Sequence, residues 1–237
     1  MSVTAVVLRR YDSGEADRRL ILYTREYGRL DAVAKGARKG ASRLAAASEP
    51  LSLAVLHLSE GRGRRYVTQS QPITSFPGLR TQYERLAMAL GLVELYATVT
   101  QAGQVDPDLF DLLEVSLRHL EAHPAPRAAL VWAELRLMSA EGVLPRWERC
   151  VESDRPIQPG VNWVSPSAGG LVDPSVTGAV DKFEVAAEVL VGLARTAELD
   201  APPERLRRDT DCLWVLHRLW MHLAHGPLPA HTSLLQT

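Results

Sequence analysis

The sequence predicts an α+β protein of two domains, a five-stranded barrel followed by an α-helical domain. Three observations support this prediction. Five short segments rich in valine and leucine, separated by glycine-containing turns, lie within residues 1–75. From residue 76 onward the apolar residues recur at helical spacing, and residues 145–180 interrupt them with a segment rich in proline, glycine and serine. We therefore expect an OB-fold barrel over residues 1–75 and a helical domain over 76–237, with an irregular insert at 145–180.

The expected strands are short and closely spaced. They cover residues 3–10, 18–25, 30–34, 51–58 and 64–71. Glu26-Tyr-Gly-Arg29 predicts a tight turn between the second and third strands, and Glu60-Gly-Arg-Gly63 predicts a hairpin between the last two. Five such strands are typical of an OB-type barrel, although an SH3-like barrel has almost the same pattern.

The first helices of the second domain follow Pro77. Residues 86–99 are apolar on more than one face, which is typical of the central helix of a bundle. Asp106 predicts an N-cap for the next helix, with Pro107 in its first turn. A third helix is expected to end at Gly142, because glycine readily adopts the left-handed conformation that closes a helix.

Two further helices are expected after the insert. Asp181 and Glu184 have the spacing of a capping box and predict a helix that begins at Asp181. A last helix has an apolar stripe from Leu206 to Leu223 and ends at Gly226. It carries several histidines, but their spacing does not place them on one face.

Composition and charge limit the classes of function that the chain can have. The chain has no run of about 18 apolar residues, so no membrane span is expected, and no signal peptide is evident. Two cysteines are too few for a disulfide framework, which favours a cytoplasmic location. Residues 1–75 hold 13 Lys and Arg against 7 Asp and Glu, whereas the remainder is acidic and the whole chain has a net charge of −1. A polyanion is therefore expected to bind the first 75 residues.

The basic residues of the barrel fall mainly in three places, on the second strand, in the loop that follows the third strand, and at the hairpin. The loop has glycines at 36 and 40 and no acidic residue between Ala32 and Ala47. Cations on such a loop suit phosphates spaced along a nucleic-acid backbone, although a solvated basic loop is an equally good interpretation. The candidate DNA-binding residues are Arg18, Arg19, Arg29, Lys35, Arg38, Lys39, Arg43, Arg62, Arg64 and Arg65.

Tyrosines 23, 27 and 66 lie near these cations and are candidates for stacking on bases, although tyrosine in a strand more often packs. Many cations and few aromatics indicate binding to the backbone with little sequence specificity. No phosphate-binding glycine loop, nucleophile elbow or metalloprotease motif is present, and we expect no enzyme. Two alternatives stay open: a scaffold whose acidic helical domain docks proteins, and an enzyme with an unrecognised site.

Eight segments that span most of the chain carry a resemblance to a known family. They are Ala5-Val-Val-Leu, Gly14-Glu-Ala-Asp-Arg18, Leu22-Tyr-Thr-Arg-Glu-Tyr-Gly-Arg29, Val33-Ala-Lys-Gly-Ala-Arg38-Lys, Glu49-Pro-Leu, Gly61-Arg-Gly-Arg64, Glu134-Leu-Arg-Leu137 and Gly142-Val-Leu-Pro145 with Cys150. In these segments the chain resembles the RecO family of bacterial DNA repair proteins.

The resemblance implies a recombination mediator that is associated with the nucleoid and has an N-terminal OB domain. Such a protein binds single- and double-stranded DNA, anneals complementary strands, engages the acidic tail of single-strand-binding protein, and works with RecR to load RecA. On this likeness the cations of residues 35–43 contact the DNA backbone. Arg136, beside Leu135, is a candidate for receiving the acidic peptide, and a solvent-facing helix residue is an equally good interpretation of Arg136.

The resemblance also draws attention to a missing metal site. Many relatives carry two Cys-x-x-Cys pairs in the insert that bind zinc. Here Cys150 is present, but the other three positions are Ser153, Asp173 and Val176. One thiol with these partners cannot form a closed zinc site, so we expect a degenerate zinc-finger-like insert without metal or other cofactor, held by the packing of Trp147, Trp163 and Leu171.

Overall fold

The computed structural model describes residues 1–39, 42, 44–61, 63–175, 178–224 and 226–236. Contacts divide the chain into two compact units, Met1–Glu121 and Ala122–Thr237. The boundary predicted at residue 75 marks the change from strands to helices, while the first compact unit continues to Glu121. None of the helices in the described ranges is long and apolar enough to cross a membrane.

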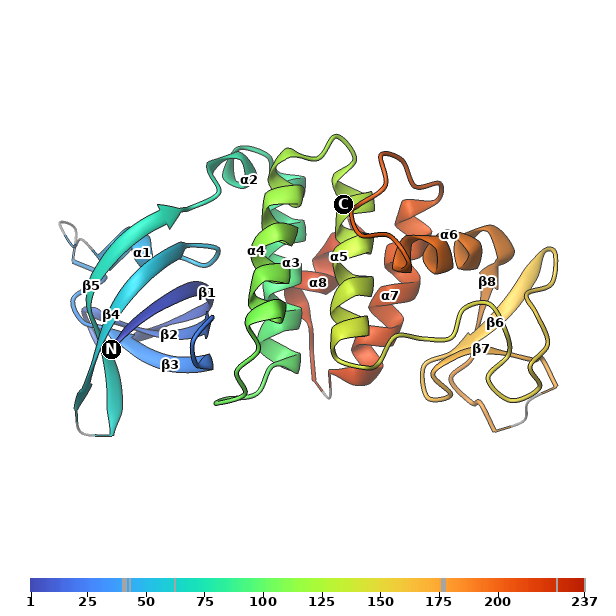
Figure 1. Ribbon diagram of the computed structural model, residues 1–237, viewed down its shortest axis with the longest axis horizontal. Helices are drawn as coiled ribbons and strands as arrows, with labels where there is room; N and C mark the ends of the chain where they lie inside the picture. Colours follow the sequence, from blue (N-terminus) through green and yellow to red (C-terminus); the bar gives the residue numbers. More distant parts are fainter. Residues whose placement is uncertain (40–41, 43, 62, 176–177, 225, 237) are drawn as a thin grey trace. The chain divides into compact units, whose positions relative to one another are not determined.

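The first unit contains the predicted barrel (Figure 1). Its strands are β1 (Ser2–Ser13), β2 (Asp17–Thr24), β3 (Gly28–Ala34), β4 (Leu53–Gly61) and β5 (Arg64–Thr74), and a short helix α1 (Leu44–Ala47) lies between β3 and β4. The strands close in the order β1-β2-β3-β5-β4, with β3 and β5 parallel and all other neighbours antiparallel. This closed five-stranded barrel confirms the expected OB-like fold.

Alternation along the strands explains the barrel core. Small and branched apolar side chains point inward from every strand, because successive residues of a strand face opposite sides. They are Val3, Ala5, Val7, Leu20, Leu22, Leu30, Ala32, Ala34, Ala54, Leu56, Leu58 and Val67. A register shift between Val7 and Arg9 lets β1 continue to Ser13, three residues beyond the predicted end.

Three helices complete the first unit, and they are α2 (Pro77–Thr81), α3 (Tyr83–Val99) and α4 (Pro107–Ala122). Buried residues occur on all sides of α3, as the sequence predicted. The Asp106 carboxylate accepts a hydrogen bond from the Leu109 N–H at 2.9 Å, which confirms the predicted cap of α4. The Tyr23 ring on β2 lies 5.9 Å from the Tyr96 ring of α3 and 6.1 Å from the Phe110 ring of α4, so both helices pack on the barrel.

The second unit combines helices with a small sheet. Its elements are α5 (Pro126–Ala140), β6 (Val161–Ser165), β7 (Gly170–Val172), β8 (Phe183–Ala186), α6 (Ala187–Ala197), α7 (Asp209–Leu223), α8 (Pro229–Ser233) and a 3-10 turn at Leu234–Gln236. The strands form an antiparallel sheet in the order β7-β6-β8, and β6 and β7 lie within the insert that the sequence predicts at residues 145–180.

The capping box predicted at Asp181 is wrong. Glu184 lies within β8, which pairs with β6, and the helix begins only at Ala187. The Asp181 carboxylate instead accepts hydrogen bonds from the hydroxyl groups of Ser165 and Ser167. Burial disfavours its charge, but these hydrogen bonds outweigh burial and lower the pKa of the Asp181 carboxyl. Tertiary strand pairing therefore overrides the local helix signal.

A buried polar network joins α5, α7 and α8. Glu134 is fully buried, and its carboxylate accepts a hydrogen bond from Trp220 Nε1 at 2.9 Å and lies 3.0 Å from His231 Nε2. The His231 ring stacks on His217, with 2.9 Å between their Nδ1 atoms. Burial and the neighbouring His231 and Arg218 lower the pKa of His217 to about 4, so the His217 ring is neutral at neutral pH. The network ties the C-terminal helix to the core.

Replacing Gly28 tests how closely the barrel and the following helices approach. Gly28 has a φ of 64°, and a Cβ atom there would lie 1.9 Å from the backbone oxygen of Gln104. We expect Gly28→Ala to lower the free energy of unfolding by about 2–4 kcal/mol, because it adds a clash to an unfavourable φ. Gly103→Ala is the control, since Gly103 also has a positive φ but open space around it, and it should cost about 1 kcal/mol. Urea unfolding measures both variants. If both lose the same free energy of unfolding, the close approach of Gly28 to the Gln104 backbone is contradicted.

Replacing His231 tests the buried network. His231→Ala leaves the Glu134 carboxylate buried without its nearest basic partner, and we expect a loss of about 3 kcal/mol in the free energy of unfolding. The control is His222→Ala, because His222 is exposed on α7, and this change should have almost no effect. Chemical denaturation followed by tryptophan fluorescence measures both. If His231→Ala leaves the free energy of unfolding almost unchanged, the network does not stabilise the position of α8.

Candidate nucleic-acid interface

The outer surface of β1, β2 and β3 carries a row of polar and aromatic side chains. In the strand register Tyr11 lies opposite Arg19, Arg19 lies opposite Val33, and Val33 pairs with Tyr66 of β5. These residues alternate with the inward-facing core, so they point away from the barrel interior. Strands 2 and 3 are also the face that OB folds use to bind oligonucleotides.

One half of this face is covered within the first unit. Tyr23 is only 1% exposed because it packs on Tyr96 and Phe110. The Arg29 guanidinium donates a hydrogen bond to the Ala97 carbonyl at 2.8 Å, close to the C-terminus of α3. A cation stabilises the carbonyl end of a helix, so Arg29 has a structural role there.

The other half of the face is open and forms a groove of about 490 Å³. Its lining residues come from β1, β2, β3 and the start of β5, and they are Ser13, Arg19, Asp31, Ala32, Val33, Gly63, Arg64 and Arg65. Arg19 therefore meets Arg64 and Arg65, which are distant from it in the sequence, around one depression.

An acidic side chain orients one of these arginines. Arg19 Nη2 lies 2.6 Å from Asp31 Oδ2 on the neighbouring strand. The hydrogen bond to Asp31 raises the pKa of the Arg19 guanidinium. Arg65 Nε lies 3.7 Å from Glu60 Oε1, whereas Arg64 is exposed and makes no side-chain hydrogen bond or ion pair within the described residues. Arg64 is therefore the arginine of the groove whose charge is least neutralised by the protein itself.

The basic loop folds back on the barrel. The Asp17 carboxylate accepts a hydrogen bond from the Gly36 N–H at 2.8 Å. Arg38 donates to the Gly14 carbonyl at 3.0 Å, and its Nε lies 3.5 Å from the Asp12 carboxylate. Lys35 Nζ lies 4.5 Å from the centroid of the Tyr66 ring, a cation–π contact that places Lys35 beside the outer row. Lys39 is exposed, and its ammonium has no partner in the described ranges.

The structure brings some of the predicted residues together and assigns structural contacts to others. Arg19, Arg64 and Arg65 line the groove, and Lys35 lies over the adjoining Tyr66. The Arg18 side chain is only 14% exposed and donates to the Ala45 carbonyl and the Ser48 hydroxyl, so it anchors α1. Arg43 and Arg62 lie outside the described residues.

Sequence reasoning missed two residues of this surface. Tyr11 was overlooked because the predicted first strand stopped at residue 10 and the register shift between Val7 and Arg9, which turns Tyr11 outward beside Arg19, has no signal in the sequence. Asp31 was overlooked because acidic residues are not expected at a nucleic-acid site, yet it positions Arg19. Of the predicted stacking residues, Tyr23 is buried and Tyr66 has one ring face occupied by Lys35.

The predicted peptide-binding pair lies on α5. Leu135 is fully buried, so its side chain belongs to the core and is not presented at the surface. Arg136 is partly exposed, and its side chain makes no hydrogen bond or ion pair with any described residue. Only Arg136 is therefore placed to meet a partner, and that role stays a prediction.

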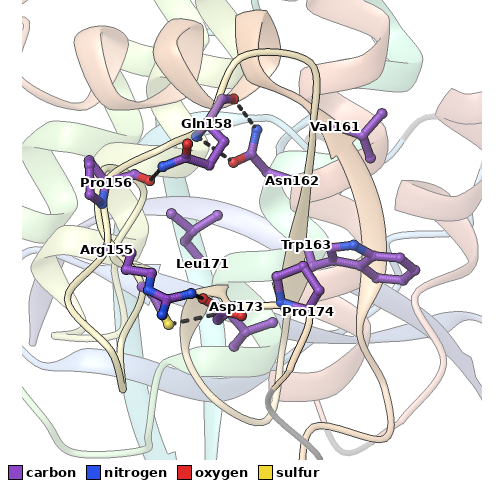
Figure 2. A pocket seen from close by; sticks show the side chains of 11 residues that line it. Arg155, Pro156, Gln158, Val161, Asn162, Trp163, Leu171, Asp173 and Pro174 are labelled. Atoms are coloured by element: carbon purple, nitrogen blue, oxygen red, sulfur yellow. Dashed lines mark hydrogen bonds and ion pairs between the residues drawn. The ribbon is translucent and has the colours of Figure 1, made fainter.

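The buried Cys150 side chain of the insert lies beside Ser153 and Asp173. The Cys150 sulfur accepts hydrogen bonds from the backbone N–H groups of Ser153 at 3.4 Å and Asp173 at 3.2 Å. Burial raises the pKa of the Cys150 thiol, but these hydrogen bonds outweigh burial and hold it below its ordinary value. Figure 2 shows Asp173 turned toward Arg155, whose Nη1 lies 2.8 Å from Oδ2 of Asp173.

Hydrogen bonds and buried apolar side chains hold the insert together. Asn162 exchanges two hydrogen bonds of 2.9 Å with the backbone of Gln158, and both residues line the same pocket (Figure 2). Of the three side chains predicted to hold the insert, Trp147 and Leu171 are buried, whereas Trp163 is only partly buried and its ring centroid lies 5.7 Å from Lys182 Nζ. Among the described residues no group of three or more His, Cys, Asp or Glu side chains can hold a metal ion, and Val176 lies outside them.

Comparison with known proteins identifies the family. A family model described as "Recombination protein O N terminal" matches residues 1–76, and one described as "Recombination protein O C terminal" matches residues 80–200. The DNA repair protein RecO of Gloeobacter violaceus is 35% identical over 220 residues, which cover 91% of this chain and 84% of that protein. The DNA repair protein RecO of Myxococcus xanthus is 32% identical over 241 residues, covering 97% of each chain. The match to the DNA repair protein RecO of Heliobacterium modesticaldum, 38% identical over 172 residues, covers 71% of this chain and 62% of that protein. The chain therefore belongs to the RecO family of recombination and DNA repair proteins.

Proposed function

We propose that this chain is a recombination mediator that binds DNA strands across the open half of the barrel's outer face. The observation that carries the proposal is the convergence of Arg19, Arg64 and Arg65 around one groove on the β2–β3 side of an OB-like barrel. Phosphates are the simplest ligands for arginines spaced around a surface groove, because a guanidinium binds a phosphate through two parallel hydrogen bonds. Family membership supports the same role, since the RecO relatives are named as DNA repair proteins.

The groove contacts explain why binding should be independent of sequence. Its cations reach phosphates, which are the same for every base, and apart from the arginines the groove is lined by Ser13, Asp31 and small or apolar residues. Lys35 and Lys39 extend the positive surface beyond Tyr66 and along the basic loop. Both single and double strands offer such phosphates, so both should bind, with an affinity that falls steeply as salt increases.

Annealing follows from the same electrostatics. Two complementary strands repel each other, and a protein that neutralises the phosphates of one or both lowers the cost of bringing them together. This process needs no nucleotide hydrolysis, and the sequence has no nucleotide-binding motif. We further propose that Arg136 receives the acidic tail of single-strand-binding protein, and that RecR joins the complex that loads RecA.

Removing two unpaired charges tests the proposed surface. Arg64→Ala combined with Lys39→Ala removes cations that have no described intramolecular partner, so the fold should be preserved. We expect weaker binding to every oligonucleotide sequence, and a slope of log affinity against log salt that is reduced by about 1.4 for single strands if each cation neutralises one phosphate. Fluorescence anisotropy of a labelled oligonucleotide at several salt concentrations measures both quantities.

A matched control uses two exposed arginines of the other unit. Arg205→Ala with Arg207→Ala changes net charge by the same amount in the second unit and should leave the slope unchanged. If the Arg64 and Lys39 pair behaves like this control, phosphates do not bind at the groove. If the unmodified chain binds no oligonucleotide even at low salt, the alternative of a protein-docking scaffold with an inactive barrel is favoured.

A single charge reversal tests the partner contact. Arg136→Glu should abolish binding of an acidic peptide ending in an aromatic residue, because it replaces the attractive charge with a repulsive one. Binding of single-stranded DNA to the barrel should be unchanged. Isothermal titration with the peptide and anisotropy with the oligonucleotide separate the two functions, and unchanged peptide affinity would remove Arg136 from the contact.

A further inference from the structure

Tyr11 is the most open aromatic side chain on the strands of the barrel's outer face. It is 46% exposed although it lies in the ordered part of β1, where aromatic side chains normally pack. Within the described residues its ring makes no aromatic contact and its hydroxyl no hydrogen bond. Tyr23, in contrast, is buried under α3 and α4. Nearly half of the Tyr11 surface is therefore open to a ligand.

The neighbours of Tyr11 place it at the rim of the groove. Arg19 lies opposite it on β2 and is held by Asp31 at 2.6 Å. Ser13, two residues further along β1 on the same face, lines the groove. An aromatic ring thus lies beside an oriented guanidinium at the edge of an open depression. Such a ring and cation are the two elements of a single-strand binding surface, one for a base and one for its phosphate.

We propose that Tyr11 stacks on an unpaired base and makes the barrel favour single strands over duplexes. The inference rests on the proposed DNA-binding function and adds a residue that distinguishes the two forms of DNA. In a duplex the faces of the bases are covered by their neighbours, so only a single strand can present a base face to the ring. Every base has such a face, so stacking adds affinity without sequence preference.

Two other tyrosines are less suitable for this contact. One face of the Tyr66 ring is occupied by the ammonium group of Lys35. Tyr27 is 44% exposed, nearly as much as Tyr11, but it lies in the turn between β2 and β3. That turn is at the opposite end of the ladder from Arg19 and Val33. Tyr27 is therefore a matched control with the same side chain and similar exposure.

The test compares Tyr11→Ala with Tyr27→Ala in the full chain. The probes are a labelled mixed-sequence single strand and the corresponding duplex, and a single strand containing 2-aminopurine reports stacking directly. We expect Tyr11→Ala to weaken single-strand binding by about 5- to 100-fold and to leave duplex binding within about twofold. The salt slope should not change, because tyrosine carries no charge. Tyr11→Phe should retain the affinity, and Tyr27→Ala should behave like the unmodified chain.

The outcomes separate this inference from the function on which it rests. An equal loss of single-strand and duplex binding in Tyr11→Ala, or no loss in either, overturns the stacking role while the groove cations still bind DNA. Unaltered quenching of 2-aminopurine in Tyr11→Ala also overturns it. Absence of binding by the unmodified chain overturns the proposed function itself. Thermal unfolding of each variant, with retained affinity in Tyr11→Phe, shows that the loss comes from the missing ring and not from misfolding.

Discussion

The packing of α3 and α4 against one end of the barrel's outer face determines where a ligand can bind. This packing depends on the close approach of Gly28 to the backbone of Gln104 and on the burial of Tyr23 beneath Tyr96 and Phe110. Arg29 contributes by donating to the last turn of α3. One half of the face is thereby used for folding, and only the half around Arg19 remains open. The same strands are thus covered by helices at one end and left open at the other, where we propose that DNA binds.

Cations on the barrel consequently differ in role although they look alike in the sequence. Arg18 and Arg29 donate to backbone carbonyls, and Arg38 donates to the β1–β2 turn. Arg64 and Lys39 have no such contacts with the described residues and keep their full capacity for phosphate. A surface guanidinium without an internal partner gives up little when it binds a phosphate, whereas a tethered one must first break its own hydrogen bonds.

The sequence predicted the fold better than the site. Strand alternation and helical spacing identified the barrel, the central helix and the cap at Asp106, because these signals are local. The capping box at Asp181 failed since pairing of β8 with β6 is a tertiary effect that a local pattern cannot reveal. The sequence shows which barrel residues are cationic but not which of them are bound by other parts of the protein. Arg18 and Arg29 donate to carbonyl groups that lie 27 and 68 positions away in the sequence, and no local pattern reveals such contacts. Tyr11 was missed because a bulge extends β1 beyond its apolar stretch.

The most direct test of the proposed binding surface is to map where a single strand touches the chain. A photoreactive oligonucleotide can be cross-linked to the full chain at low salt, and the modified peptides identified by mass spectrometry. Binding across the open half of the face predicts cross-links in peptides that contain Tyr11, Arg19, Val33 and Arg64, with few in the covered half around Tyr23. Cross-links confined to residues 122–237, or concentrated at the turn that contains Tyr27, would contradict it.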